Sequence, residues 1–247
     1  MRLNESRMVS VVGDAFGVSA ATSLESAPHV QHGVALLVGL ERDVTVTDAS
    51  GTRVCGRVVV VPPDLPHAVE APGPMVGMLY DPESLPHVAG YARLGRGARV
   101  LDGRFASRLV GAVTAHRAAL SRHDVLDGLG RETAAALRES PRLRPDKRVA
   151  RVVEELRDPH VERRLLIEGS GLSEAHLQAL FVRDVGLPIR SFRLWQRLLA
   201  AVVSLRHVDA TRAAHLAGFA DLAHFSRTCR RMLGHSPTTM RSALLAT

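Results

Sequence analysis

Cysteine, aromatic residues and long apolar runs are scarce in this sequence. Of its 247 residues only two are cysteines, Cys55 and Cys229, and they lie far apart and match no metal-binding or redox spacing. We therefore expect a reduced, cytoplasmic protein in which both are small core residues. No run approaches the roughly 18 apolar residues of a membrane span, and the N-terminus lacks a sustained apolar core. Membrane insertion and secretion are accordingly not expected.

Positive charge is concentrated in the C-terminal part of the chain. Residues 1–140 carry 14 Arg and 15 acidic residues, a net charge of −1, whereas residues 141–247 carry 18 basic and 10 acidic residues, a net charge of +8. Arg supplies 31 of the 32 basic residues, and its guanidinium group forks onto phosphate or guanine. A localised positive surface suits a polyanion such as nucleic acid. A solvated basic face without a partner is the alternative.

A candidate linker divides the chain. Residues 139–147 combine two prolines with charged residues and few apolar ones, as exposed linkers do. We place the domain boundary there, so that residues 1–140 and 141–247 form two domains. The hydrophobic content of 46% is enough for a core in each.

The first domain has a β-type pattern followed by a helical one. Short apolar runs separated by turn residues predict strands and a small barrel or sandwich, and they lie at residues 34–40, 44–47, 54–61 and 75–80. Phe105, Leu109, Val113 and Leu120 then recur at helical spacing and indicate one face of an antiparallel helix pair. This face would serve equally well as core or as a dimer seam.

Two segments of the second domain follow one plan. Each begins at a tight turn followed by an N-cap residue, Ser173 or Asp221, and each ends at a glycine, Gly186 or Gly234. A short helix, a turn built on glycine and a second helix with one apolar face make a helix-turn-helix unit. The pattern predicts two such units. A helical bundle without a nucleic-acid role is the alternative.

The second unit offers the better surface for reading DNA. Phe225, Cys229 and either Met232 or Leu233 form the inward stripe of its second helix. The predicted DNA-contacting residues of this helix are Ala223, His224, Ser226, Arg227, Arg230 and Arg231. Arg227 fits guanine or phosphate, Ser226 a base edge or the backbone, and Ala223 a thymine methyl.

The first unit presents less hydrogen-bonding capacity. Leu177, Leu180 and Phe181 point inward, which leaves Ala175, Gln178 and Ala179 as the predicted DNA-contacting residues. Of these, Gln178 alone hydrogen-bonds strongly, and it fits adenine. We therefore expect the second unit to be the main reader of sequence.

Both units resemble the AraC/XylS family of transcription regulators. The second unit matches the family signature in register at Gly218, Phe219, Asp221, His224, Phe225, Ser226, Arg227, Arg230, Arg231, Gly234, Ser236, Pro237 and Arg241. The first unit matches it at Gly171, Leu172, Ser173, His176, Leu177, Leu180, Phe181 and Gly186, and the linker helix at Arg197, Leu198 and Ala201. Cys229 departs from the phenylalanine that is usual in the family.

This resemblance spans about residues 152–241 and implies how the domain binds double-stranded DNA. The two units, about 163–185 and 210–233, are joined by a linker helix at about 191–206 and face successive major grooves. RNA polymerase is implied as a protein partner. Activation and repression both remain open.

The first domain resembles, over a shorter stretch, the cupin-like domain of many family members. Residues 58–68 are similar to the strand and turn that deliver a histidine into that barrel. The expected fold class is therefore α+β in two domains, a cupin-like β-barrel with a helix pair followed by an all-α double helix-turn-helix domain. The resemblance implies effector binding and homodimerisation in the first domain.

Three histidines, His29, His32 and His67, are the candidate effector-binding residues. They would also suit a three-histidine metal site, but no carboxylate follows His32 at the expected spacing. No metal and no cofactor are therefore expected. Because aromatic residues are few, the effector pocket should be lined by Val, Leu and Met.

The predicted function is a sequence-specific DNA-binding transcription regulator controlled by a small molecule, and not an enzyme. A metal-dependent cupin enzyme, or a DNA-modifying protein that uses the basic domain for targeting, is one alternative. No histidine and carboxylate can be assigned around Cys55 to make it a nucleophile. A protein-interaction module that modulates another regulator is the other alternative.

Overall fold

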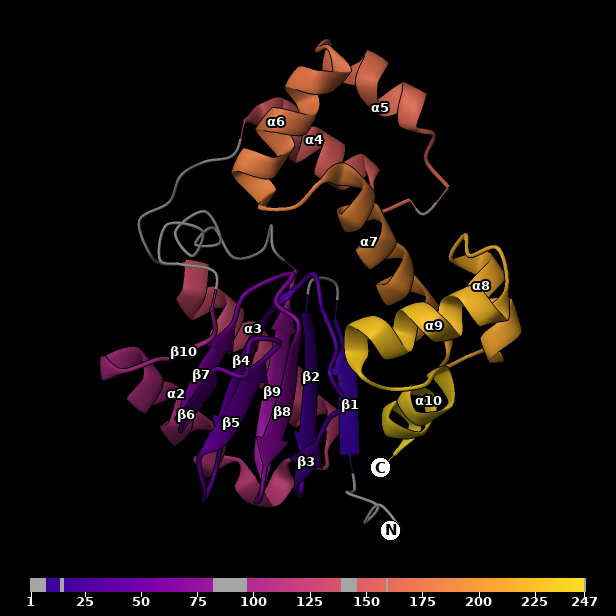
Figure 1. Cartoon of the computed structure of the whole chain (residues 1–247). Coiled ribbons are helices and arrows are strands. Elements are labelled where there is room, and N and C mark those ends of the chain that lie inside the picture. The colour runs from indigo at the N-terminus through magenta and orange to yellow at the C-terminus, as the bar shows by residue number, and fades with distance from the viewer. Residues whose placement is uncertain (1–7, 14–15, 82–96, 139–145, 159, 247) are drawn as a thin grey trace.

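Apolar strands in the N-terminal part form two facing β-sheets, and helices follow them. The computed structural model describes residues 8–13, 16–81, 97–138, 146–158 and 160–246 (Figure 1). The strands are β1 (Met8–Val12), β2 (Phe16–Ala21), β3 (Leu24–Glu25), β4 (Val34–Gly39), β5 (Val44–Asp48), β6 (Arg53–Gly56), β7 (Val58–Val61), β8 (His67–Ala71), β9 (Met75–Tyr80) and β10 (Arg99–Val100). One sheet has the order β1-β2-β9-β4-β7-β10 and the other β3-β8-β5-β6.

The central strand β4 lies between two apolar cores, which explains why its sequence does not alternate with polar residues. Leu36 and Val38 pack into the core that faces the helices, and Ala35 and Leu37 pack into the core between the sheets. A strand that is buried on both faces has no side chain in solvent. The fully apolar run that predicted this strand is thus a direct consequence of its position.

The strand predicted at residues 54–61 is two strands. It divides at Arg57, whose Nε donates to the carbonyl of Gly39 at 3.1 Å. The first half, β6, pairs in the four-stranded sheet, and the second half, β7, pairs in the six-stranded sheet. The chain therefore crosses from one sheet to the other within a continuous apolar stretch. The strands β1, β2, β3, β8 and β10 were not predicted.

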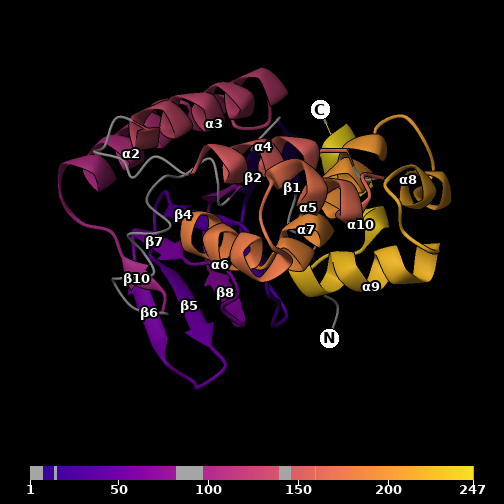
Figure 2. The same ribbon diagram turned by 90° about the horizontal axis from the view of Figure 1, so that it is seen from above.

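Two helices cover the outer face of the six-stranded sheet, α2 (Gly103–Ala115) and α3 (His123–Arg138). Figure 2 shows them on one side of the sandwich, with β5, β6 and β8 on the other. Leu109, Val113 and Leu120 are buried in the core against the sheet, and Phe105 packs against it. This face is therefore core, and it is not available as a dimer seam.

The helices of the C-terminal part are α4 (Lys147–Glu155), α5 (Arg163–Ser170), α6 (Glu174–Val185), α7 (Ile189–Ser204), α8 (Ala210–Leu216), α9 (Leu222–Leu233) and α10 (Pro237–Leu245). The predicted fold class, with a β-rich first part and a helical second part, is confirmed. Most of the predicted linker, residues 139–145, lies outside the described residues. Among those described, no helix combines the length and apolarity that a membrane span requires.

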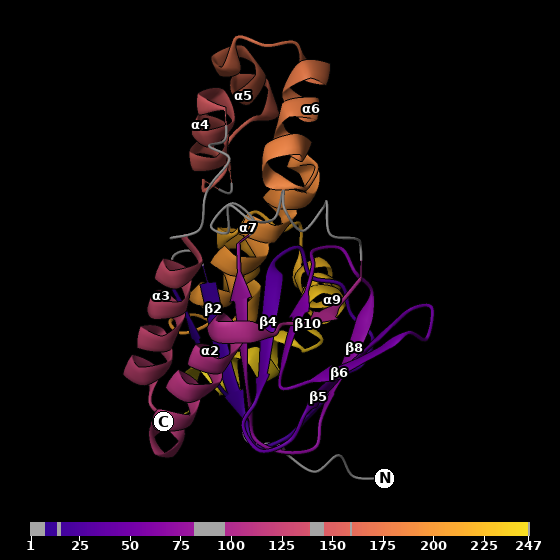
Figure 3. The same cartoon turned by 90° about the vertical axis from the view of Figure 1, so that its left-hand side faces the viewer.

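The C-terminal helices build two cores that meet along α7. The first core joins α4, α5 and α6, and the second joins α7, α8, α9 and α10. Met8, Val12 and Leu79 of the sandwich pack against the second core. Figures 1 and 3 show the result: α4, α5 and α6 stand above the sandwich, whereas α10 lies beside β1.

Candidate DNA interface and the cavity between the two parts

Local capping defines the helix α9. The carboxylate of Asp221 accepts a hydrogen bond from the His224 N–H at 2.6 Å, and Gly234 ends the helix with a φ of 74°. Phe225 and Cys229 are fully buried and hold the helix against α8 and α10. The predicted cap, stop and inward stripe are confirmed.

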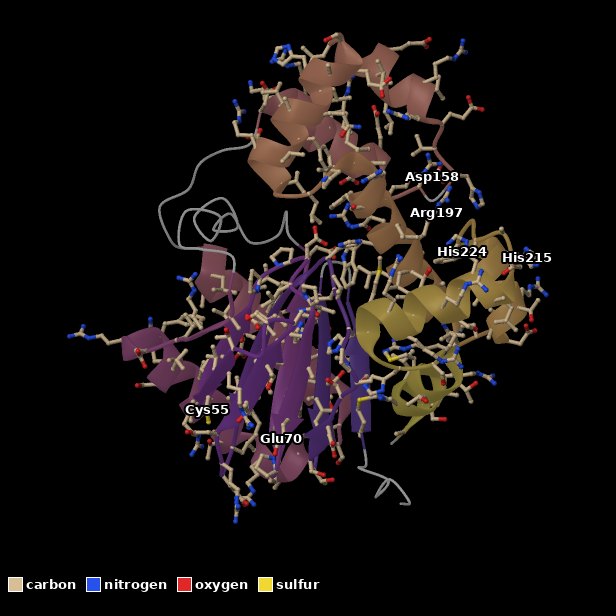
Figure 4. All side chains as sticks on the ribbon, viewed as in Figure 1. Cys55, Glu70, Asp158, Arg197, His215 and His224 are labelled. Atoms are coloured by element: carbon tan, nitrogen blue, oxygen red, sulfur yellow. The ribbon has the colours of Figure 1, made fainter. Side chains whose placement is uncertain are left out.

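The outward face of α9 is basic. Arg227, Arg230 and Arg231 are exposed, and in the part of the chain that the structure describes no carboxylate pairs with any of them. Ala223 is exposed too, and Ser226 and His224 are half-buried. The ring of His224 packs edge-on against Phe219, at 5.1 Å between centroids. Figure 4 places His224 on the same side of the molecule as Arg197 of α7.

The outward face of α6 is less polar. Ser173 caps the helix through the His176 N–H at 3.4 Å, and Gly186 ends it with a φ of 83°. Ala175 and Ala179 are exposed. Gln178 is half-buried in a hollow that Arg163 of α5 and Arg190 and Arg193 of α7 also line. Arginines from neighbouring helices thus surround the one strongly hydrogen-bonding residue of this face.

The sequence of this region matches a known family. Residues 166–243 match the helix-turn-helix domain family, over both units and the helix that joins them. The C-terminal part of the chain is an AraC-type helix-turn-helix domain. No curated protein matches the sequence of the chain.

Solved structures of ToxT from Vibrio cholerae share the fold of the whole chain. ToxT of strain O395 is 9% identical, with a TM-score of 0.57 over 95% of this chain and 100% of that chain. Wild-type ToxT of strain SCE256, bound to an unsaturated fatty acid, is 11% identical, with a TM-score of 0.57 over 99% of both chains. ToxT of strain O395 bound to (E)-4-(8-methylnaphthalen-1-yl)but-3-enoic acid is 8% identical, with a TM-score of 0.58 over 93% and 99%. At these identities the likeness shows the fold alone.

A cavity of about 160 Å³ lies between the sandwich and the AraC-type domain. The sandwich contributes residues of β1, β2, β4, β8 and β9, and the AraC-type domain contributes residues of α7, α9 and α10. Most lining side chains are Val, Leu, Met and Ala. Met232 and Leu233 belong to the last turn of α9, so the cavity touches this helix directly.

His29 and His67 form one polar end of this cavity. Their ring centroids lie 4.4 Å apart, and their main chains exchange hydrogen bonds of 2.9 and 3.0 Å. Burial lowers the pKa of His29, and burial together with the charge of His29 lowers the pKa of His67 to about 4. Both rings are therefore neutral at pH 7. Two of the three predicted effector-binding histidines thus come together at a cavity.

His32 does not join them. Its Nδ1 pairs with the carboxylate of Asp64, and His32 does not line the cavity. In the described ranges no three histidine, cysteine or acidic side chains are placed to hold a metal ion. The third histidine of the cavity is His235, which follows the C-cap of α9. Nothing local in the sequence marks His235, because only the packing of the two parts brings it to His29.

A buried polar contact also joins the two parts. The carboxylate of Asp81, which follows β9, accepts hydrogen bonds from Trp195 Nε1 and from Gln196 Nε2 of α7, the latter at 3.4 Å. Burial raises the pKa of Asp81 to about 6. Gly33 leaves room for Trp195, because a Cβ there would lie 3.1 Å from Cζ2 of that ring. The sequence predicts no role for Asp81.

Cys55 has no catalytic surroundings. It is exposed, so the expectation that both cysteines are core residues is wrong for Cys55, and the polar atom near its Sγ is Oδ2 of Asp43, at 4.0 Å. Figure 4 places Cys55 and Glu70 at the end of the sandwich far from the AraC-type domain. No histidine of the described residues is hydrogen-bonded to Cys55 to activate it as a nucleophile.

Proposed function

We propose that this protein is a sequence-specific DNA-binding transcription regulator whose DNA affinity is controlled by a small molecule bound between its two parts. The observation that carries the proposal is the unpaired basic face of α9 within an AraC-type helix-turn-helix domain. Phosphate and guanine are the partners that such a face suits.

The proposed contacts follow from the exposed side chains. Arg227 forks onto a guanine, with Ser226 beside it and Ala223 against a thymine methyl. Arg230 and Arg231 lie one turn further along and hold phosphates, and so does His224 at the start of the helix.

The first unit adds a weaker contact. Gln178 pairs with an adenine, and Ala175 and Ala179 permit close approach of α6 to the groove. The arginines around Gln178 contribute phosphate contacts. RNA polymerase as a protein partner and a homodimer belong to the same proposal.

The cavity supports control by a small molecule. Structures of ToxT, which has the same fold, contain an unsaturated fatty acid or (E)-4-(8-methylnaphthalen-1-yl)but-3-enoic acid, and this supports a small-molecule ligand here. Here the cavity has an apolar lining, His29 and His67 at one end, and Met232 of α9 in its wall. A molecule that binds more tightly when α9 is in one position than in another shifts the protein toward that position. The DNA affinity can change only by as much as the molecule's two binding free energies differ.

Selection from random duplexes with the full chain tests the proposal. We expect one preferred sequence, bound with an affinity that falls steeply as salt is raised, because bound phosphates release counterions. Arg227→Ala should weaken binding and relax one base position. Arg104→Ala, on α2, is the charge-matched control and should bind as the unmodified chain does. A chain that selects no sequence, or an Arg227→Ala variant with unchanged preference, contradicts the proposal.

A further inference from the structure

We infer that the cavity binds an uncharged amphipathic molecule, with an apolar body of about six carbons and a head, such as a carboxamide, that both donates and accepts hydrogen bonds. This inference rests on the proposed function, since it names the class of effector. It follows from the size of the cavity, from an unpaired glutamine in its wall, and from the kind of side chains around that glutamine.

The apolar part of the cavity sets the body of the ligand. A cavity of about 150 Å³ lined by apolar side chains holds one benzene ring. The 160 Å³ here includes the polar end, so the apolar part, lined by side chains such as Leu37, Val202 and Met240, takes a body no larger than about one such ring. A short alkyl chain has this size.

Gln31 sets the polar head. Its side chain lines the cavity and is 3% exposed, yet among the described residues neither Oε1 nor Nε2 has a hydrogen-bond partner. The serines of the lining are already bonded: Ser10 to Ser19 at 2.7 Å, and Ser26 to the N–H of Val69 at 2.9 Å. An unpaired buried amide is costly, so a head that donates to Oε1 and accepts from Nε2 removes the cost.

The two histidines add acceptors. Nδ1 of His29 lies 3.0 Å from the carbonyl oxygen of Ala27, and Nδ1 of His67 lies 2.8 Å from that of Leu65. A carbonyl accepts only, so Nδ1 carries the proton in each ring. In the neutral form this leaves Nε2 of both rings as acceptors, which favours a head with N–H or O–H groups.

No charged group balances an ion in the cavity. Within the described part of the chain its lining contains no Arg, Lys, Asp or Glu. An ionised carboxylate would therefore be buried without a cation, at a large desolvation cost. The cavity thus disfavours ionised fatty acids, although a ToxT structure of the same fold holds an unsaturated fatty acid.

Calorimetric titration of the full chain at pH 7.5 tests the inference with three matched probes, hexanamide, hexanoate and hexylammonium. We expect hexanamide to bind at least tenfold more tightly than either ion. Equal or tighter binding of hexanoate would overturn the inference, and so would proton uptake with hexanoate, seen as a buffer-dependent heat. If hexanamide does not bind, the inference is overturned too. The proposed DNA-binding function is then still decided by the duplex selection, which is done without ligand.

Two variants connect the result to Gln31. Gln31→Leu keeps the volume and removes both unpaired groups, so it should fold and should lower the affinity for hexanamide by about tenfold. Thr47→Val, a similar exchange on β5 outside the cavity lining, should leave that affinity unchanged. Unchanged affinity in Gln31→Leu would refute the role of Gln31. If Gln31→Leu does not fold, the comparison of probes on the unmodified chain still decides.

Discussion

Replacing Asp81 by Asn should make the protein less sensitive to pH, because Asp81 is a carboxyl group buried between the two parts. Burial raises its pKa from 3.8 to about 6, against the smaller opposing effects of the hydrogen bonds from Trp195 and Gln196 and of the charge of Arg157. The folded protein therefore binds this proton more tightly than the unfolded chain does. Its stability must fall as the pH rises from about 4 through 6.

The size of the effect follows from the two pKa values. One pKa unit corresponds to 1.36 kcal/mol, so the full difference amounts to ~3 kcal/mol. More than half of this stability is lost below pH 5. Between pH 5 and pH 7.5 the linkage relation gives a further loss of about 1.4 kcal/mol in the free energy of unfolding. Asn at position 81 does not titrate. It still accepts from Trp195 Nε1, and the amide of Gln196 needs only to rotate so that its oxygen faces the new NH₂ group.

Urea unfolding at pH 5 and pH 7.5 measures this difference. Trp195 is the sole tryptophan and donates to Asp81, so its fluorescence reports on the contact. We expect the unmodified chain to lose about 1.4 kcal/mol more than Asp81→Asn between the two pH values. Asp102→Asn, at an exposed carboxyl without a capping hydrogen bond, is the control and should behave as the unmodified chain. If Asp81→Asn and the unmodified chain lose the same free energy of unfolding between the two pH values, the reasoning is refuted.

Three further predictions concern the AraC-type domain. Gln178→Ala should reduce base discrimination by less than Arg227→Ala, for which about 1–3 kcal/mol is expected at one base position, and competition assays with single-base variants of the selected duplex measure both. Equal losses would contradict the primacy of α9. Asp221→Ala removes the N-cap of α9 and should cost about 1 kcal/mol, seen as a lower thermal midpoint, whereas an unchanged midpoint would show that the cap contributes nothing. Phe192→Ala should cost about 3–5 kcal/mol, because the ring is fully buried between α6 and α7, and a loss under 1 kcal/mol would mean that this core repacks freely.

The caps and turns of the helical domain could be predicted because their causes are local. Asp221 and Ser173 bond to N–H groups three residues ahead, and Gly186 and Gly234 adopt positive φ, whatever surrounds them. The inward stripe of α9 was likewise predictable, since helical periodicity alone places Phe225 and Cys229 on one face.

The strands were predicted where the sequence shows an apolar run, as in β4, or alternates apolar with polar residues, as in β5. In contrast, β1 is short and β2 mixes valine with glycine, serine and alanine, so both give a weak pattern. β8 begins at His67, directly after Pro66, so the start of this strand has the sequence pattern of a turn. The division of residues 54–61 between two sheets depends on long-range pairing, which no local pattern reveals.

The cavity required the tertiary structure, because its polar end is assembled from distant segments. His29 meets His67 through pairing across the sandwich, and His235 arrives from the far end of the chain. The sequence therefore indicated histidines as effector-binding residues, but it also included His32. The pairing of His32 with Asp64 depends on a turn that only the fold shows. Gln31 carried no signal, since a glutamine becomes informative only when it is buried and unpaired.

The position of the cavity also explains how a ligand would act unequally on the two units. The N–H of Val30 donates to the carbonyl of Arg231 at 2.7 Å, and Met232 lines the cavity, so the last turn of α9 is bonded to the sandwich. The proposed DNA-contacting residues from Ala223 to Arg227 lie toward the other end of the same helix. A ligand that shifts the last turn would, on this proposal, also shift these residues, because they belong to one continuous helix. Since α6 does not line the cavity, the helix that we propose as the main reader of sequence is also the helix that the proposed ligand would contact.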